Sequence, residues 1–572
     1  MWIDELLQVS FYAHPLDQIA RHAAHQQQPP LDYWIGYWVS LFSPGDFAVR
    51  LPSAFFGVGA VFFVTLLAGS MYPLPVAYGT GILAALLPFN IHFSQEARPY
   101  SIAVLLFLAL LWALTRLLDS TAGKRGKVLT LFLIAVAFLH SRGFEPMVIT
   151  VLLIFILIVQ LGFSMVSKGF LNAGSQRAVL YAAAALGLAL TIYLPTFRTL
   201  LSYGDTYLAE KQNLLSLGPL LKGIEDFALE PLILSFVFQT EPLTYPLIAL
   251  LILSPFTAWR MRLWPSHEVF VLCALLLPGI SLLHLFVFQA YTDMPFKPQY
   301  AFYLLPLALI LSGVAFQGLW IMASNLKHAR IPKAILVAVA AFMVLWAVDS
   351  TWSFTASKKK EDWRGLCQYL AGTYGPERIL LFDTLVPYGA WEGNFYGFRR
   401  YYRGNTKRLA VAQIPLLCEE LGRMDKEPVL ILYHRAEWCL TSQSLYCRCL
   451  PPASRPEYFT LRPAEADDRI SVTSFTGFQI LTLKKKGKDS ARDTYTLLSA
   501  SLSRLPGDSS VIDLHLASAC LARVLGLSDW EGHLIAAETL ATDSQRLKMS
   551  GIAKRVRDLR PMSTVHGSQF KG

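Results

Sequence analysis

The chain has 572 residues, of which 54% are hydrophobic and only 16% are charged. Soluble domains carry about 25% charged residues, so the composition excludes an ordinary soluble protein and predicts an integral membrane protein. The formal net charge of +10 does not indicate a nucleic-acid partner. Much of the basic excess lies in short loops between apolar segments, where lysine and arginine set the orientation of a membrane protein.

Ten apolar segments are candidates for membrane-spanning helices, which need about 20 mostly apolar residues. They are residues 51–71, 75–92, 99–118, 128–141, 146–164, 178–197, 242–259, 268–290, 299–322 and 333–350. The fourth segment is the shortest and the weakest candidate. We therefore predict a polytopic helical domain.

The charges of the connecting loops predict how these segments cross the membrane. One set of loops is basic, with Arg116, Lys124, Arg125, Lys127, Lys168, Arg177, Arg260, Arg262, Lys327, Arg330 and Lys333. Basic loops are typically cytoplasmic, so the acidic loops and the C-terminal part are predicted to lie outside the cell membrane. Because the polar N-terminal segment would also lie outside, we expect a further spanning helix upstream of Met1.

The chain becomes more polar after about residue 355. A helix-like pattern and three strand-like patterns follow, at 363–370, 378–383, 428–433 and 479–483. Their alternation predicts a small α/β domain. The expected organisation is a transmembrane catalytic domain at 1–354, an extracytoplasmic α/β domain at 355–486 and a helical tail at 487–572. The predicted fold class is thus mainly α, with a polytopic membrane helical domain at its centre.

The cysteines divide into two groups. Cys273 lies in an apolar segment and is expected to be an inert core residue. A second group lies in the C-terminal part, at Cys418, Cys439, Cys447 and Cys449. If this part is extracytoplasmic, one or two disulfides are expected, with a pairing that the sequence does not determine.

Carboxylates next to the apolar segments are candidates for function, because charged groups beside a bilayer are costly to keep. Asp4 and Glu5 precede the first apolar segment, and Glu96 lies between two others. Several short sequence motifs occur around these carboxylates and farther along the chain, in a fixed order. These are Trp2-Ile3-Asp4-Glu5, Gln28-Pro29-Pro30-Leu31-Asp32-Tyr33, Arg50-Leu51-Pro52-Ser53, Ser94-Gln95-Glu96-Ala97-Arg98-Pro99-Tyr100, His140 and Glu361-Asp362-Trp363-Arg364.

This succession resembles the GT-C glycosyltransferases that use polyprenyl-phosphate sugars, in particular the protein O-mannosyltransferase and aminoarabinose transferase group. The resemblance implies a GT-C fold and transfer of a mannose-like hexose or an aminoarabinose-like pentose, with inversion, on the outer face. The implied partners are a polyprenyl-phosphate-linked donor, membrane lipids, and a lipid, glycan or protein acceptor. The sequence departs from the family at the absent first helix, at Gln28, and at Lys297 in a loop where relatives carry Arg-Tyr.

The resemblance assigns catalytic roles to three carboxylates. Asp4 is the candidate base that accepts the proton of the attacking hydroxyl, which typically gives about 10²–10⁴-fold in rate. Glu5 is the alternative base or an acceptor ligand, and Glu96 is expected to orient the acceptor or hold Arg98. The competing interpretations are a solvated helix N-terminus for Asp4 and Glu5, and a simple interfacial ion pair for Glu96 and Arg98.

Five further residues are predicted to bind the substrate. Arg98 and Lys297 are candidate ligands of the lipid phosphate, His140 and Tyr100 are candidate cavity residues, and Arg50 is expected to brace the acidic first loop. The alternative for Lys297 is an interfacial lysine whose charge reaches water, and the alternative for His140 is a structural role. No spacing motif selects a metal, so a divalent cation stays open as a cofactor.

Two other classes of function compete with the transferase. A transporter or lipid-sugar flippase would also be polytopic, although such proteins usually place charges near the membrane midplane in repeated halves. A membrane-anchored binding protein would place its activity in the C-terminal domain, but a simple anchor does not require ten spans.

Overall fold

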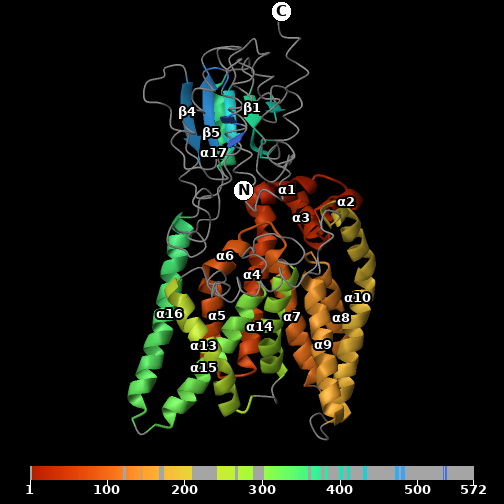
Figure 1. The fold of residues 1–572 in the computed structure, drawn as a ribbon, viewed down its shortest axis with the longest axis vertical. Coiled ribbons are helices and arrows are strands. Elements are labelled where there is room, and N and C mark those ends of the chain that lie inside the picture. Colours follow the sequence, from red (N-terminus) through yellow and green to blue (C-terminus); the bar gives the residue numbers. More distant parts are fainter. Residues whose placement is uncertain are drawn as a thin grey trace, which may run out of the picture. The chain divides into compact units, whose positions relative to one another are not determined.

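The structure is a computed structural model of the chain (Figure 1). It describes residues 3–26, 28–119, 124–143, 145–166, 173–208, 241–263, 268–287, 302–326, 328–357 and 362–374. In the C-terminal part it describes 380–383, 397–398, 400–402, 409–412, 429–433, 470–475, 478–483, 492, 528, 532–533 and 535–536. Lys297, the four C-terminal cysteines and nearly all of the predicted helical tail lie outside the described residues.

The chain divides into two compact units. One comprises Gln8–Ser357 with Ser444–Tyr446, and the other comprises Met1–Leu7, Lys358–Gln443 and Cys447–Gly572. Helix α1 (Ile3–Phe11) begins in the second of these and continues into the first.

The unit around Gln8–Ser357 is helical in its described part. Its further helices are α2 (Leu16–His25), α3 (Leu31–Phe42), α4 (Asp46–Gly69), α5 (Leu74–Leu86), α6 (Pro88–Ser94), α7 (Tyr100–Leu118), α8 (Lys124–Leu139), α9 (Glu145–Val166), α10 (Ala173–Leu208), α13 (Glu241–Arg260), α14 (Glu268–Val287), α15 (Leu304–Ser324) and α16 (Arg330–Ser357). Each of the ten predicted apolar segments therefore contains a helix.

Six of these helices are long and apolar enough to cross a membrane, and the bent pair of α5 and α6 meets the same criteria when its two helices are taken together. The pair is bent by 60°, and Pro88 begins α6 after the break. Helix α8 falls short because its 16 residues rise only about 24 Å against a hydrocarbon core of about 30 Å. The described chain is thus a multi-pass membrane protein, and the predicted membrane helical domain is confirmed.

Burial separates central helices from peripheral ones. In α7 and α15, 78% of the apolar window is buried inside the protein, against 11% in α16. Helices α7 and α15 therefore form the centre of the bundle, while α16 presents most of its surface to lipid. Figure 1 shows α10 and α16 at opposite sides of the bundle, and α2, α3 and α6 at one end of it. Cys273 is buried in α14, as predicted.

Aromatic side chains hold the helices together near that end. Phe93 of α6 packs with Phe89, Tyr100 and Phe302, with ring centroids 4.5–4.8 Å apart. Such tilted and edge-on pairs contribute about 0.5–1.5 kcal/mol each beyond their burial. The cluster fixes the start of α7 against α6, and with it the residues of the turn between them.

Two glycines let helices approach closely. A side chain at Gly57 of α4 would overlap Ser94 of α6, and one at Gly313 of α15 would overlap Tyr72 and Thr80. Small residues at helix crossings are typical of membrane bundles, where close packing replaces the hydrophobic effect as the driving force.

The described C-terminal part contains a five-stranded sheet in the order β2-β1-β3-β5-β4. The strands are β1 (Leu380–Asp383), β2 (Leu409–Ala412), β3 (Val429–Tyr433), β4 (Ile470–Phe475) and β5 (Phe478–Leu483). Strand β1 pairs in parallel with β2 and β3, whereas β5 pairs antiparallel with β3 and β4. Strands were predicted at β1, β3 and β5, so the expected mixture of strands and helix is found here.

Helix α17 (Trp363–Thr373) packs on this sheet. The side chain of Asp362 accepts a hydrogen bond from Gly365 N at 2.9 Å and so caps the helix. Tyr369 and Tyr374 form hydroxyl contacts with Thr473 and Thr482 of the β4–β5 pair. These two contacts connect α17 and the residue that follows it to the antiparallel pair of β4 and β5.

Candidate active site

A buried polar cluster joins α1, α3 and the segment between them. The Gln8 side-chain amide donates hydrogen bonds to Asp32 and, at 3.1 Å, to the hydroxyl of Tyr12. Asp32 lies in the first turn of α3 and is 6% exposed. Burial raises the pKa of Asp32 to about 6, while the Gln8 hydrogen bond and the charge of Arg98 act in the opposite direction. Arg98 is therefore close enough to stabilise the Asp32 carboxylate.

The turn from α6 to α7 adds a second acid. His92 Nε2 lies 3.1 Å from Glu96 Oε1, and both side chains are almost completely buried, at 1% and 5% exposed. The backbone N–H of Arg98 donates to Glu96 O at 2.8 Å. Helix α7 begins at Tyr100 after Pro99, as the sequence predicted. The carboxylate of Glu96 thus lies beside His92 of α6 and close to the positive end of α7.

The turn from α8 to α9 contributes a second arginine. Arg142 Nη2 lies 3.4 Å from Glu145 Oε1, and both side chains are about 95% buried. The Gly143 N–H donates to Gln28 Oε1 at 3.1 Å, and the Tyr193 hydroxyl donates to Gly143 O at 3.2 Å. These bonds connect the turn to the Gln28 string and to α10.

Two guanidinium groups approach the same aromatic ring. Arg142 Cζ lies 4.5 Å from the ring centroid of Tyr100, and Arg98 Cζ lies 5.8 Å from it. Cations within about 6 Å of a ring face are attracted by its quadrupole. Arg98, Arg142 and Tyr100, together with Asp32 and Glu96, are called the arginine–carboxylate cluster below.

This cluster has the composition of an anion site with acids beside it. Arginine binds phosphate oxygens through paired hydrogen bonds and keeps its charge when buried. The N-terminus of α7 adds partial positive charge in the same place. The cluster is therefore suited to hold a phosphate, and its carboxylates are suited to orient or deprotonate a hydroxyl.

The structure brings together three of the predicted site residues, Glu96, Arg98 and Tyr100. Glu5 is fully buried in α1. Asp4 lies in α1, but its side chain is outside the described residues. Arg50 is half-buried in the second turn of α4.

His140 is engaged at both ring nitrogens. Its Nδ1 lies 2.9 Å from Val136 O, and its Nε2 lies 3.3 Å from Thr196 Oγ1. Because a carbonyl can only accept, Nδ1 carries a proton and donates to Val136 O. The ring also packs edge-on against Tyr193, with centroids 5.2 Å apart. In this arrangement His140 links α8 to α10.

Sequence reasoning assigned no role to Asp32, His92, Arg142 or Glu145, nor to Gln8. The sequence could have indicated Asp32, because it lies in the string Gln28 to Tyr33 that carries the family resemblance. It could also have indicated Arg142 and Glu145, because these opposite charges lie three residues apart between two apolar segments. His92 gave no such signal, because a histidine in an apolar segment is more often structural. Among the residues with described side chains, no three His, Cys, Asp or Glu lie close enough together to hold a metal ion.

Comparison with known families tests the predicted resemblance. Residues 27–192 match the model of the dolichyl-phosphate-mannose-protein mannosyltransferase family. The match confirms the resemblance to the polyprenyl-phosphate-sugar glycosyltransferases over this segment. It includes every member of the arginine–carboxylate cluster, so the mannosyltransferase pattern and the buried polar residues occupy the same part of the chain.

Solved structures of similar shape come from two kinds of enzyme. ArnT from Cupriavidus metallidurans in the apo state is 12% identical, with 80% of this chain and 87% of that chain covered and a TM-score of 0.43. The same protein bound to undecaprenyl phosphate is also 12% identical, with 80% of this chain and 88% of that chain covered and a TM-score of 0.41. Another similar structure is the archaeal oligosaccharyltransferase AglB from Archaeoglobus fulgidus, in complex with an inhibitory peptide and a dolichol-phosphate. It is 13% identical, with 94% of this chain and 82% of that chain covered and a TM-score of 0.46. No curated protein sequence matched the chain.

Proposed function

We propose that the chain is a membrane glycosyltransferase that moves a sugar from a polyprenyl-phosphate carrier to an acceptor hydroxyl. The observation that carries the proposal is the approach of Arg98 and Arg142 to one ring beside buried carboxylates. A reaction whose leaving group is a lipid phosphate needs buried positive charge on the leaving side. The family match over the same residues supports this assignment.

In the proposed step, the acceptor oxygen attacks the anomeric carbon and the bond from that carbon to the phosphate oxygen breaks. The proton of the acceptor passes to a carboxylate, and the electron pair of the broken bond stays on the polyprenyl phosphate. Arg98 and Arg142 stabilise the negative charge of the leaving phosphate. A single displacement of this kind inverts the anomeric centre.

Asp4 is the proposed base, with Glu5 as its alternative. Asp4 precedes Gln8 by one turn of α1, and positions four apart lie on the same helix face. Gln8 is itself part of the polar cluster around Asp32. Glu96 is proposed to orient the acceptor, and Lys297, His140 and Arg50 keep the binding roles predicted from the sequence.

The proposed donor carries a mannose-like hexose or an aminoarabinose-like pentose, and the acceptor is a lipid, glycan or protein. The proposed site faces the outside of the cell membrane, because the loops on the other side hold most of the lysine and arginine. The C-terminal part, with its sheet, is proposed to lie on that outer side as well.

The test uses the full chain, reconstituted in lipid vesicles with synthetic polyprenyl-phosphate sugars. The acceptor is first identified by comparing the glycans and lipids of a deletion strain with those of its parent. Asp4→Asn is expected to lower transfer by about 10²–10⁴-fold, and Glu96→Gln to lower it as well. The matched control is Asp17→Asn, because Asp17 forms an exposed pair with Arg21. Near-normal transfer in both test variants would refute the assigned roles.

A further inference from the structure

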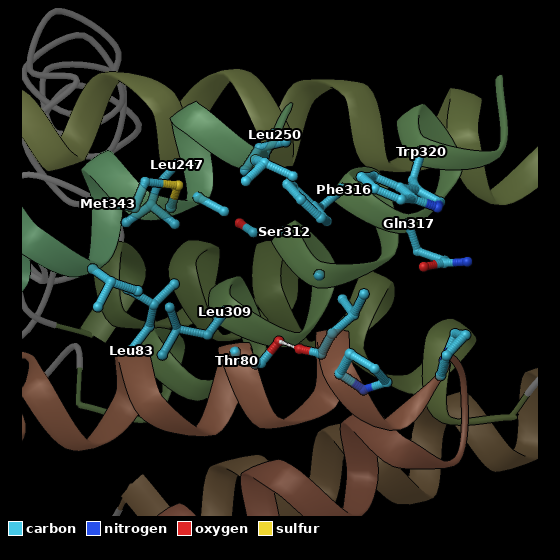
Figure 2. A pocket seen from close by; sticks show the side chains of 18 residues that line it. Thr80, Leu83, Leu247, Leu250, Leu309, Ser312, Phe316, Gln317, Trp320 and Met343 are labelled. Atoms are coloured by element: carbon cyan, nitrogen blue, oxygen red, sulfur yellow. Dashed lines mark hydrogen bonds between the residues drawn. The ribbon is translucent and has the colours of Figure 1, made fainter. Parts of the chain in front are cut away.

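A cavity lies in the helical unit, and no member of the arginine–carboxylate cluster lines it. It measures about 410 Å³ and lies between α5, α13, α15 and α16 (Figure 2). This volume falls within the range of about 300–1,000 Å³ that is typical of small-molecule sites. Tyr303 precedes α15 at the cluster end of the bundle and packs on Phe107. Trp320, which lines the cavity, lies about 25 Å farther along α15.

The lining is almost entirely apolar. Figure 2 shows Leu83, Leu247, Leu250, Leu309 and Met343 around the space. Voids much larger than a water molecule are uncommon in protein interiors, and an apolar cavity of this kind does not hold water well. Its natural filling in a bilayer is therefore a hydrocarbon chain.

Three of the lining residues, Thr80, Ser312 and Gln317, have polar side chains outside the tryptophan ring. The Thr80 hydroxyl contacts the Tyr72 hydroxyl at 3.0 Å and donates to Val76 O at 3.0 Å. Ser312 is 4% exposed, and its hydroxyl has no hydrogen-bond partner among the described residues. An ordered water needs two to four polar partners, and a single hydroxyl does not supply them, so Ser312 does not change the apolar character of the space.

The cavity opens toward lipid beside α16. Val337, one of its lining residues, is 54% exposed, on a helix whose apolar window is only 11% buried. A lipid chain therefore reaches the space laterally from the bilayer, without passing through the bundle.

A positive charge lies at one end of the cavity. Lys333 Nζ lies 5.4 Å from the ring centroid of Trp320, which lines the space. Arg330 begins the same helix and is exposed. Basic residues at the mouth of a pocket between transmembrane helices attract anionic lipid headgroups. The charge and the apolar space thus fit the two parts of one amphiphile.

The length of the cavity distinguishes between lipids. The lining residues of α15 run from Leu309 to Trp320, which corresponds to about 17 Å of helix. This is about half of the 30 Å hydrocarbon core, or one leaflet. A space of that length fits a single acyl chain, whereas a long polyprenyl chain would extend beyond it.

We propose that the cavity between α5, α13, α15 and α16 binds an acyl chain of an anionic phospholipid, with the lipid phosphate at Lys333. The bound lipid supports the packing of α16 against the bundle. This site is distinct from the proposed transfer site, because its lining residues include no member of the arginine–carboxylate cluster.

The test measures lipid retention by the full chain with native mass spectrometry. The protein is purified in mild detergent and equilibrated with equal amounts of palmitoyl-oleoyl phosphatidylglycerol and palmitoyl-oleoyl phosphatidylcholine. The wild type is expected to retain the phosphatidylglycerol preferentially. Lys333→Gln is expected to lower this preference about fivefold, the worth of one lysine near an anionic lipid. Arg260→Gln is the matched control, because Arg260 is an exposed arginine at the end of α13 and should leave the preference unchanged.

Two further variants fill the cavity. A Cβ added at Gly79 would meet no heavy atom within 4 Å, so Gly79→Leu is expected to fold and to reduce retention of both lipids. Ser312→Leu is expected to act in the same way without the loss of a hydrogen bond. Gly187→Leu, at a glycine of α10 that also has open space around it, is the control. Thermal unfolding confirms that each variant is folded.

Three results would overturn the proposal. The first is equal retention of the two phospholipids by the wild type. The second is a loss of preference in Arg260→Gln as large as that in Lys333→Gln. The third is displacement of the phospholipid by an equal amount of undecaprenyl phosphate, which would assign the cavity to an isoprenoid chain instead.

Discussion

Arg142 lies over the ring of Tyr100, with its Cζ 4.5 Å from the ring centroid. The two residues belong to different turns, one between α8 and α9 and the other at the start of α7. Arg98 approaches the same ring at 5.8 Å. Tyr100 thus positions two cations from separate elements, although it does not itself need to touch the reacting atoms.

The two arginines are expected to bind the phosphate of the donor. Arg98→Gln and Arg142→Gln should each lower kcat/KM for the polyprenyl-phosphate sugar by about 10–100-fold, since a hydrogen bond to a charged group contributes about 1.5–3 kcal/mol. Much of the loss should appear as a higher KM for the donor. Lysine at either position should restore only part of the activity, because it lacks the paired donors of a guanidinium group.

The matched control for these variants is Arg116→Gln. Arg116 lies near the other end of α7, with its Cζ 5.7 Å from the ring of Trp112, so it has the same kind of contact away from the cluster. Steady-state kinetics should show little change in this variant. An equal loss in Arg116→Gln would assign the effect to cation–ring packing in general.

Asp32 is expected to make stability depend on pH. Burial raises its pKa from 3.8 to about 6, so the folded protein holds this proton more tightly than the unfolded chain. The contribution to the free energy of unfolding is therefore highest below pH of about 4 and falls as the pH rises through 6, by at most about 3 kcal/mol. Asp32→Asn should remove this fall.

Unfolding midpoints in mild detergent between pH of about 4 and 7.5 provide the measurement for Asp32. The relevant quantity is the difference between the two pH profiles, because other groups titrate in the same range. Asp17→Asn, at an exposed acid, should reproduce the wild-type profile. Parallel profiles for Asp32→Asn and the wild type would mean that Asp32 does not titrate in this range.

His92 and Glu96 are expected to be energetically coupled. Leaving one buried polar partner without the other typically costs about 1–3 kcal/mol. His92→Gln and Glu96→Gln should each be destabilising, and the double variant should cost less than their sum by about 0.5–3 kcal/mol. The same cycle on the exposed pair of Arg21 and Asp17 should give a coupling of about 1 kcal/mol or less. Denaturant unfolding of the four variants measures both cycles, and additive effects for His92 and Glu96 would contradict the pairing.

Gly57→Ala should separate α4 from α6. A methyl group there would overlap the side chain of Ser94, and overpacking of this kind typically costs about 1–3 kcal/mol. Because α6 leads into the turn that holds Glu96, transfer should fall along with thermal stability. Gly187→Ala, where a side chain meets open space, should be neutral or stabilising because alanine favours the helix more than glycine does.

Much of the fold could be predicted because apolar periodicity acts locally. Each predicted span corresponds to a helix, and the strands at β1, β3 and β5 follow the predicted segments closely. The break between α5 and α6 was not predicted, although Pro88 is visible in the sequence. Leu87 and Pro88 sit within a continuous apolar stretch, so composition alone indicates one span where the backbone forms two helices.

Members of the arginine–carboxylate cluster could be predicted only where a charge stands out against an apolar background. Glu96 and Arg98 do so, and the structure places both in the cluster. Asp32 and Arg142 were missed because their significance depends on burial and on partners distant in sequence. Arg142 acquires its place from the contact with Tyr100, and no local pattern around residue 142 encodes that contact.

The 60° bend between α5 and α6 gives the two halves of one apolar stretch different directions and different neighbours. The outward side of α5 contacts hydrocarbon, whereas α6 packs in the aromatic cluster around Phe93 and leads to the Glu96 carboxylate. A substitution on α5 can therefore tune the fit to a thicker or thinner bilayer without turning His92 or Glu96 away from their neighbours. In a straight helix, the same change would rotate both together.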